Sequence, residues 1–172
     1  SLLVSLYPTS WAKSLKVLER VSGFIRQGHG LGVAFGIHLE GPFVSPARPG
    51  ALPRNHFRSP SLKELRQLLA AGDGLVRTMT LAPELKGGRG LIRVCRKNGV
   101  VPAFGHSNSD YEGTRAAISH GVRYATHLFN AMNGLHHRSP GAVTALLEDP
   151  RVSVEVISDG HHVDAPALRL IN

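Results

Sequence analysis

Cysteine is almost missing from this sequence of 172 residues, which contains only Cys95. A single cysteine excludes a fold held together by disulfides within the chain, and it suits a reducing compartment. The sequence also lacks an apolar run approaching the roughly 20 residues of a membrane helix, and no pattern of a secretory leader is present. We therefore predict a cytoplasmic protein with no membrane partner.

Aromatic residues are scarce as well, at 6% of the chain, although the formal net charge is +8. The basic residues are scattered and form no run, so the sequence predicts neither a stacking platform for bases nor a concentrated phosphate-binding surface. A nucleic-acid partner is therefore not expected. An excess of cations equally suits an anionic small-molecule substrate.

Hydrophobic residues make up 42% of the chain, which is enough for one buried core in a single domain. Short segments rich in β-formers alternate with segments of helical periodicity. Strands are predicted at residues 2–7, 33–39, 75–81, 100–104, 124–128 and 153–157, and helices at 11–26, 61–71, 90–98, 111–119, 141–147 and from about 165. This order predicts an α/β fold of about six βα units with a mainly parallel sheet, in which 44–58 is the long connection.

Polar side chains recur at or just after the carboxyl ends of these predicted strands. They are His38, Glu40, Glu84, His106, His127, Asp159 and His162. Periodicity alone does not separate a doubly wound sheet from a barrel. In a barrel, however, the carboxyl ends of all strands share one face and converge on one site, so the recurrence favours a barrel.

The segment GIHLEGPF, residues 36–43, ends a hydrophobic strand with an ionisable pair. A buried carboxylate requires a partner, and Glu40 together with His106 and His127 forms a donor set suited to a divalent transition metal. Zinc is the first choice, with iron, cobalt and manganese as alternatives. Three protein ligands leave a coordination position for water or substrate. The competing interpretation is that each histidine is a hydrogen-bonded wall residue.

Five segments together resemble the signature blocks of the N-acetylglucosamine-6-phosphate deacetylase family, in the amidohydrolase superfamily. They are GIHLEGPF, TLAPE, GHSNSD, THLFNAMNGLHHRSPG and ISDGHHVD, in this order over almost the whole chain. The resemblance implies a (β/α)8 barrel of the TIM type, of which residues 1–172 supply strands two to seven as one partial domain. It also implies removal of acetate from N-acetylglucosamine 6-phosphate, with Glu40, His106 and His127 as the metal ligands.

The resemblance further implies a set of substrate contacts. Asn130 and Ala131 correspond to residues that meet the phosphate, partly through backbone N–H groups. Arg138 corresponds to a phosphate-binding arginine, a task that suits a guanidinium fork. His162 corresponds to a histidine at the substrate amide and sugar. Without the resemblance, Arg138 would be interpreted as a solvated loop cation and His162 as a surface histidine.

The sequence also departs from the family pattern. The family's general base is an aspartate on the last barrel strand, which is expected beyond Asn172, so no catalytic residue is assigned within the chain. Leu52 stands where many relatives have a histidine in a loop over the substrate. The first and last barrel strands are expected to be missing, which leaves two sheet edges open to association with another chain. We expect this chain alone to bind a divalent metal weakly and to hydrolyse little. The resemblance implies a homodimer for the full-length family.

Two alternatives stay open at this point. The first is another amidohydrolase that acts on a different amide or a cyclic ureide, which the phosphate elements at 130–138 argue against. The second is a non-catalytic remnant that binds a metal or a phosphosugar without turnover. A substrate panel and calorimetry with the phosphosugar separate these from the deacetylase.

Overall fold

The strands of the protein form one parallel sheet in the computed structural model, which describes residues 2–28 and 34–171. The strands are β1 (Leu2–Leu6), β2 (Ala34–Glu40), β3 (Val76–Leu81), β4 (Val101–Phe104), β5 (Tyr124–Ala125) and β6 (Ser153–Val154). Their order in the sheet is the order in the sequence, and every neighbouring pair is parallel. Each crossover therefore returns the chain to the adjacent position, as in a barrel.

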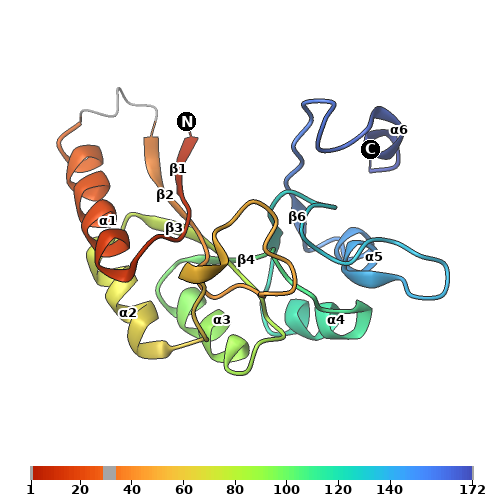
Figure 1. The fold of residues 1–172 in the computed structure, drawn as a ribbon, viewed down its shortest axis with the longest axis horizontal. Helices are drawn as coiled ribbons and strands as arrows, with labels where there is room; N and C mark the ends of the chain where they lie inside the picture. The colour runs from red at the N-terminus through yellow and green to blue at the C-terminus, as the bar shows by residue number, and fades with distance from the viewer. Residues whose placement is uncertain (1, 29–33, 172) are drawn as a thin grey trace.

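The helices lie between the strands in the chain and follow one another along the outside of the sheet, from α1 to α5 (Figure 1). They are α1 (Trp11–Arg26), the 3-10 helix η1 (Arg54–His56), α2 (Leu62–Ala71), α3 (Gly88–Lys97), α4 (Tyr111–Ser119), α5 (Gly141–Glu148) and α6 (Ala165–Arg169). Within the described residues, no helix combines the length and the apolar character needed to cross a membrane.

The two faces of the sheet have different chemistry because side chains alternate along each strand. On β2, Ile37 and Leu39 join the hydrophobic core that also contains Leu18 of α1 and Leu65 of α2. His38, next to both of them in the chain, lies on the opposite, concave face. The core therefore fills the space between sheet and helices, and polar side chains occupy the concave face.

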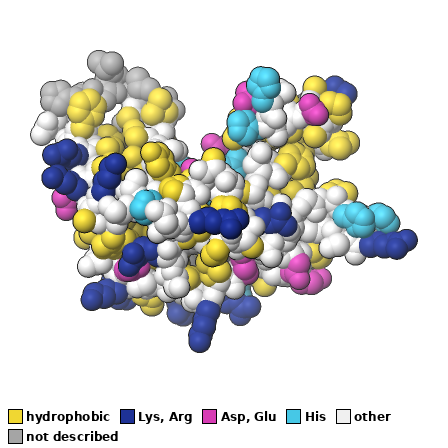
Figure 2. Space-filling model, viewed as in Figure 1, with side chains coloured by type: hydrophobic (Ala, Val, Ile, Leu, Met, Phe, Trp, Pro, Cys, Tyr) yellow, Lys and Arg dark blue, Asp and Glu magenta, His cyan; other side chains and the backbone are white. Residues whose placement is uncertain are grey.

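The curled sheet is open at β1 and β6, which end the strand order. The space-filling view shows the molecule hollowed between the part that carries β1 and β2 and the part that carries β6 and α6 (Figure 2). The predicted α/β organisation and parallel sheet are confirmed, in the form of a half-barrel of six strands. A closed ring of eight strands is not formed by the described residues.

Two predicted strands are wrong in length. The predictions 124–128 and 153–157 correspond to β5 and β6, each of two residues. The chain leaves the extended conformation after Ala125, since φ is +35° at His127 and +76° at Phe129. For the predicted strand 33–39, β2 begins at Ala34, and residue 33 lies outside the described residues. The predicted connection 44–58 contains η1.

Side-chain caps begin two of the helices. The Ser61 hydroxyl accepts a hydrogen bond from the Glu64 N–H at the start of α2, and an Asp110 carboxylate oxygen accepts from the Gly113 N–H at the start of α4. The Ser61 bond forms the first half of a capping box, in which a glutamate side chain three residues later bonds back to the N-cap N–H in the second half. In the second half, the Glu64 carboxylate instead accepts from Arg58 Nε at 2.9 Å.

Candidate metal centre

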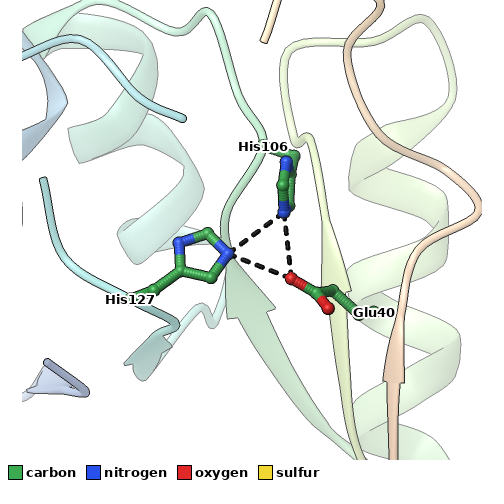
Figure 3. A group of neighbouring side chains, drawn as sticks. All are labelled: Glu40, His106 and His127. Atoms are coloured by element: carbon green, nitrogen blue, oxygen red, sulfur yellow. Dashed lines mark hydrogen bonds and ion pairs between the residues drawn. The ribbon is translucent and has the colours of Figure 1, made fainter. Parts of the chain in front are cut away.

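Three side chains from the carboxyl ends of separate strands point toward one another (Figure 3). Glu40 ends β2, His106 follows β4, and His127 follows β5. Glu40 Oε1 lies 3.0 Å from His106 Nε2 and 3.1 Å from His127 Nε2, and the two Nε2 atoms are 3.0 Å apart. The fold thus brings the predicted donor set into one place, although the three residues are far apart in the sequence.

The spacing of these atoms fits an ion. Zinc binds imidazole nitrogen and carboxylate oxygen at about 2.0–2.2 Å, which places ligand atoms about 2.8–3.6 Å apart for angles between 90° and tetrahedral. The observed separations of 3.0 and 3.1 Å lie within this range. A divalent cation therefore fits among the three atoms after small adjustments of the side chains.

The tautomer of His106 supports the same interpretation. His106 Nδ1 lies 3.0 Å from the carbonyl oxygen of Arg48, which can only accept, so Nδ1 carries the proton. A neutral His106 then presents a bare Nε2 lone pair toward Glu40 and His127. Lone pairs facing one another repel, whereas a cation between them satisfies all three, and a carbonyl partner on the far nitrogen is typical of metal-binding histidines.

Electrostatics favour an ionised carboxylate at the centre of the group. The imidazoles of His106 and then of His127, each within hydrogen-bond distance of Glu40 Oε1, lower the pKa of the Glu40 carboxyl well below its usual range, against the opposing effect of burial. The negative charge suits a cation. His127 Nδ1 is buried and has no hydrogen-bond partner among the described residues, so the outer side of this imidazole is unsupported.

Two glycines let the backbone approach close to the site. A Cβ on Gly105 would lie 2.4 Å from Thr126 Cγ2 and 2.7 Å from Thr80 Cγ2. The backbone directly before His106 therefore passes close to the side chains of these two threonines. Gly50 has φ +51°, and a Cβ there would lie 3.1 Å from His106 Cε1. The loop after β2 therefore lies directly over the His106 ring.

The loops that carry or flank the three candidate ligands are tied together by polar side chains. The Arg48 guanidinium donates from Nε to Asn108 Oδ1 at 3.0 Å and also bonds Asn133 Oδ1. The Asn133 amide in turn donates to the carbonyls of Asn108 and Ser109 at 3.0 and 2.8 Å. Arg48 and Asn133 were not predicted as site residues. Asn133 lies inside the signature segment THLFNAMNGLHHRSPG and Arg48 lies shortly after GIHLEGPF, and this placement is the signal that the sequence offers.

His38 is buried beside the site and takes no part in the donor set. Its Nδ1 contacts Ser5 Oγ at 2.9 Å and its Nε2 contacts Thr80 Oγ1 at 2.8 Å, so both ring nitrogens have partners. Desolvation by burial lowers the pKa of His38, with a smaller opposing effect of Glu40. His38 is therefore a neutral, hydrogen-bonded residue of the concave face. Of the ionisable pair in GIHLEGPF, Glu40 is thus a candidate metal ligand, and His38 is a hydrogen-bonded histidine of the concave face.

The predicted substrate-binding residues have different surroundings. Asn130 N–H donates to the His127 carbonyl at 2.9 Å, and the Ala131 carbonyl accepts from Ser107 N–H at 3.2 Å, so this loop packs against the His106 loop. Arg138 is exposed in the segment 133–140. His162 is also exposed, and its Nδ1 lies 2.7 Å from Asp159 Oδ2. The structure does not bring Arg138 or His162 into contact with the three candidate ligands.

No protein-family model matches the chain. Among curated proteins, the N-acetylgalactosamine-6-phosphate deacetylase of Escherichia coli O157:H7 is 39% identical over 153 residues, which cover 89% of this chain and 41% of that protein. The solved structure of N-acetyl-D-glucosamine-6-phosphate deacetylase from Mycobacterium smegmatis superposes with a TM-score of 0.93 at 41% identity. The match covers 99% of this chain and 44% of that one.

An aspartate-to-alanine mutant of the Mycobacterium smegmatis protein, solved in complex with N-acetyl-D-glucosamine-6-phosphate, superposes equally well, with a TM-score of 0.93. In both comparisons this chain spans less than half the length of the relative, at 41% and 44%. The likeness therefore covers nearly all of this chain and a part of each relative.

Proposed function

Because this chain is homologous to the N-acetylglucosamine-6-phosphate deacetylases, which are hydrolases, we propose that it forms part of a metal-dependent deacetylase with a (β/α)8 barrel. The substrate is N-acetyl-D-glucosamine 6-phosphate, which loses acetate to give D-glucosamine 6-phosphate. The observation that carries the proposal is the convergence of Glu40, His106 and His127 in a chain of this ancestry.

We propose zinc as the ion, with iron, cobalt and manganese as alternatives, since mixed imidazole and carboxylate donors suit all four. Such an ion, when bound, lowers the pKa of a water molecule and polarises a carbonyl group. Glu40 supplies the negative charge of the donor set, and His106 and His127 supply neutral nitrogens. The Arg48 carbonyl keeps the proton of His106 on Nδ1, which leaves Nε2 available to the ion.

The loop after β5 is the proposed phosphate site. The Asn130 backbone N–H already donates to the His127 carbonyl, and its side-chain amide donates one N–H to the Leu128 carbonyl at 3.3 Å. The proposed anion contacts are therefore the second N–H of that side-chain amide and the Ala131 N–H. Arg138 contributes a guanidinium, which binds phosphate through paired N–H groups. The exposed position of Arg138 means that the 133–140 segment has to bring this side chain to the phosphate.

His162 is the proposed contact to the acetamido group and sugar. Its Nδ1 is bonded to Asp159 Oδ2, so its Nε2 is the atom directed to the substrate. The general base that takes the proton of water and returns it to the leaving amine is proposed to lie outside these 172 residues. We further propose a cytoplasmic location and a homodimer. Light scattering of the whole protein tests the homodimer.

A transplant tests the function directly. The matching part of the Mycobacterium smegmatis enzyme is replaced by this chain, and acetate release from N-acetylglucosamine 6-phosphate is measured with zinc. We expect turnover by the transplant and none by its Glu40→Gln, His127→Ala double variant. A folded, zinc-loaded transplant that releases no acetate would refute the proposal. The 172-residue chain alone is expected to release acetate only slowly.

A second substrate has an observation in its favour. The Escherichia coli relative that is 39% identical over 89% of this chain is named for N-acetylgalactosamine 6-phosphate. The two sugars differ only in the configuration at C4, whereas the acetamido group is carried by C2. Measuring acetate release by the transplant with both phosphosugars identifies the preferred one, and a preference for the galactosamine derivative would replace the substrate proposed above.

A further inference from the structure

Glu84 lies three residues after β3, between the strands that carry Glu40 and His106. Its carboxylate accepts two hydrogen bonds, one from Ser107 Oγ at 2.7 Å and one from Asn108 N–H at 2.7 Å. Both donors belong to the residues that directly follow His106. Glu84 is therefore hydrogen-bonded to the turn that carries His106, a candidate metal ligand, and makes no contact with the imidazole itself.

This turn has an unfavourable backbone conformation. His106 has φ +47°, in the left-handed region that side chains other than glycine rarely adopt. Such a conformation persists only when the surrounding contacts hold it. Ser107 is fully buried, and its Oγ also accepts from Ser109 N–H at 3.1 Å, so the Glu84 bond completes a short chain of hydrogen bonds through the turn.

We propose that Glu84 is a positioning residue of the metal centre, which fixes the His106 turn so that Nε2 faces Glu40 and His127. The ring of His106 is held separately by the Arg48 carbonyl, so backbone and ring are fixed from two sides. The inference rests on the proposed function in one respect, namely that Glu40, His106 and His127 bind an ion. Glu84 itself is not a ligand.

The experiment compares zinc affinity, by competition with a chromogenic chelator, between the wild-type chain and matched variants. Glu84→Ala removes both acceptors, and we expect zinc affinity to fall about tenfold or more, within the 10–100-fold range for lost outer supports of metal ligands. Glu84→Gln keeps an acceptor and is expected to restore most of the affinity. Glu19→Ala removes an exposed carboxylate of α1 and is expected to change nothing.

A second measurement needs no metal. Long-range 1H–15N spectra of the zinc-free chain report which nitrogen of His106 carries the proton. We expect Nδ1 protonation in the wild type and a mixture of tautomers in Glu84→Ala, because a loosened turn moves the ring from the Arg48 carbonyl. A role confined to fold stability would lower the free energy of unfolding and leave this spectrum unchanged.

The outcomes separate the two proposals. A wild-type chain without zinc affinity contradicts the proposed function, while the His106 spectrum still tests Glu84. A folded Glu84→Ala chain with wild-type zinc affinity and an unchanged spectrum overturns the positioning role. If Glu84→Ala does not fold, Ser107→Ala removes one of the same two bonds from its other end, and unchanged affinity and spectrum in that variant overturn the role equally.

Discussion

The Nε2 atoms of His106 and His127 lie 3.0 Å apart, and their ring planes meet at 84°. Glu40 Oε1 lies within 3.1 Å of both nitrogens. One hydrogen atom on either nitrogen can serve only part of this three-way contact, because a neutral imidazole has a single N–H. A cation serves all three atoms together. This relationship is the basis of the claim that the three residues hold one divalent ion.

Substitution of His38 and of His127 should distinguish a wall histidine from a ligand. His127→Ala is expected to weaken zinc binding by more than the roughly 100-fold upper limit for a lost outer support. His38→Ala is expected to lower the free energy of unfolding by about 1–3 kcal/mol, because it leaves the buried hydroxyl of Thr80 without its imidazole partner. Chelator competition and urea unfolding of both variants provide the measurements.

The control for this pair of variants is the zinc affinity of His38→Ala. Zinc affinity in His38→Ala should stay near the wild-type value, since both nitrogens of His38 are occupied by hydroxyl contacts. Equal losses of zinc affinity in the two variants would show that His38 belongs to the donor set, which contradicts the assignment.

Gly105→Ala should disturb the site through packing alone. The new Cβ would meet Thr126 Cγ2 and Thr80 Cγ2 at 2.4 and 2.7 Å, and such overpacking costs about 1–3 kcal/mol. Because His106 is the next residue, zinc affinity should fall as well. Gly134→Ala is the matched control, since a Cβ there has nothing within 4 Å. A Gly105→Ala chain with the stability and zinc affinity of this control would contradict the close approach.

Arg138→Ala should weaken phosphosugar binding without changing zinc affinity. Calorimetry of the zinc-loaded transplant with N-acetylglucosamine 6-phosphate is expected to show a loss of about tenfold, consistent with a charge-assisted bond to phosphate. N-acetylglucosamine without the phosphate should bind both proteins equally weakly. If the phosphosugar binds Arg138→Ala as it binds the wild type, Arg138 is only a solvated loop cation.

Stability should fall at alkaline pH because of Cys95. Burial raises the pKa of the Cys95 thiol to about 12, whereas an unfolded thiol titrates near 8.5. Between these values only the unfolded chain loses the proton, so the contribution of Cys95 is complete below about pH 8.5 and declines as pH rises toward 12. Urea unfolding between pH 8 and about 10 should show a slope steeper by up to about 1.4 kcal/mol per pH unit in the wild type than in Cys95→Ala. Equal slopes would contradict this.

Much of the fold follows from local signals in the sequence. The helix α1 has the predicted bounds because apolar residues recur at helical spacing, and α4 begins where Asp110 can cap it. The strand β5 is shorter than predicted because the chain turns at His127 with φ +35°, and β6 pairs with this short strand. A positive φ at a residue other than glycine is imposed by its tertiary surroundings, which no local pattern contains.

The candidate donor set was predictable for a different reason. Glu40, His106 and His127 each follow a hydrophobic strand, and parallel strands deliver their carboxyl ends to one edge. The supports of these residues were not predictable. The Arg48 carbonyl and the Asn133 amide lie in two separate loops, after β2 and after β5, whose paths depend on the whole fold, and neither residue type is specific to a metal site.

The most direct measurement is an anomalous difference map, at the zinc edge, of crystals of the chain grown with zinc. We predict one strong peak bonded to Glu40, His106 Nε2 and His127 Nε2, at about 2.0–2.2 Å from each. A map whose strongest peak lies on exposed histidines such as His136 and His137, with none among the three converging side chains, would contradict it.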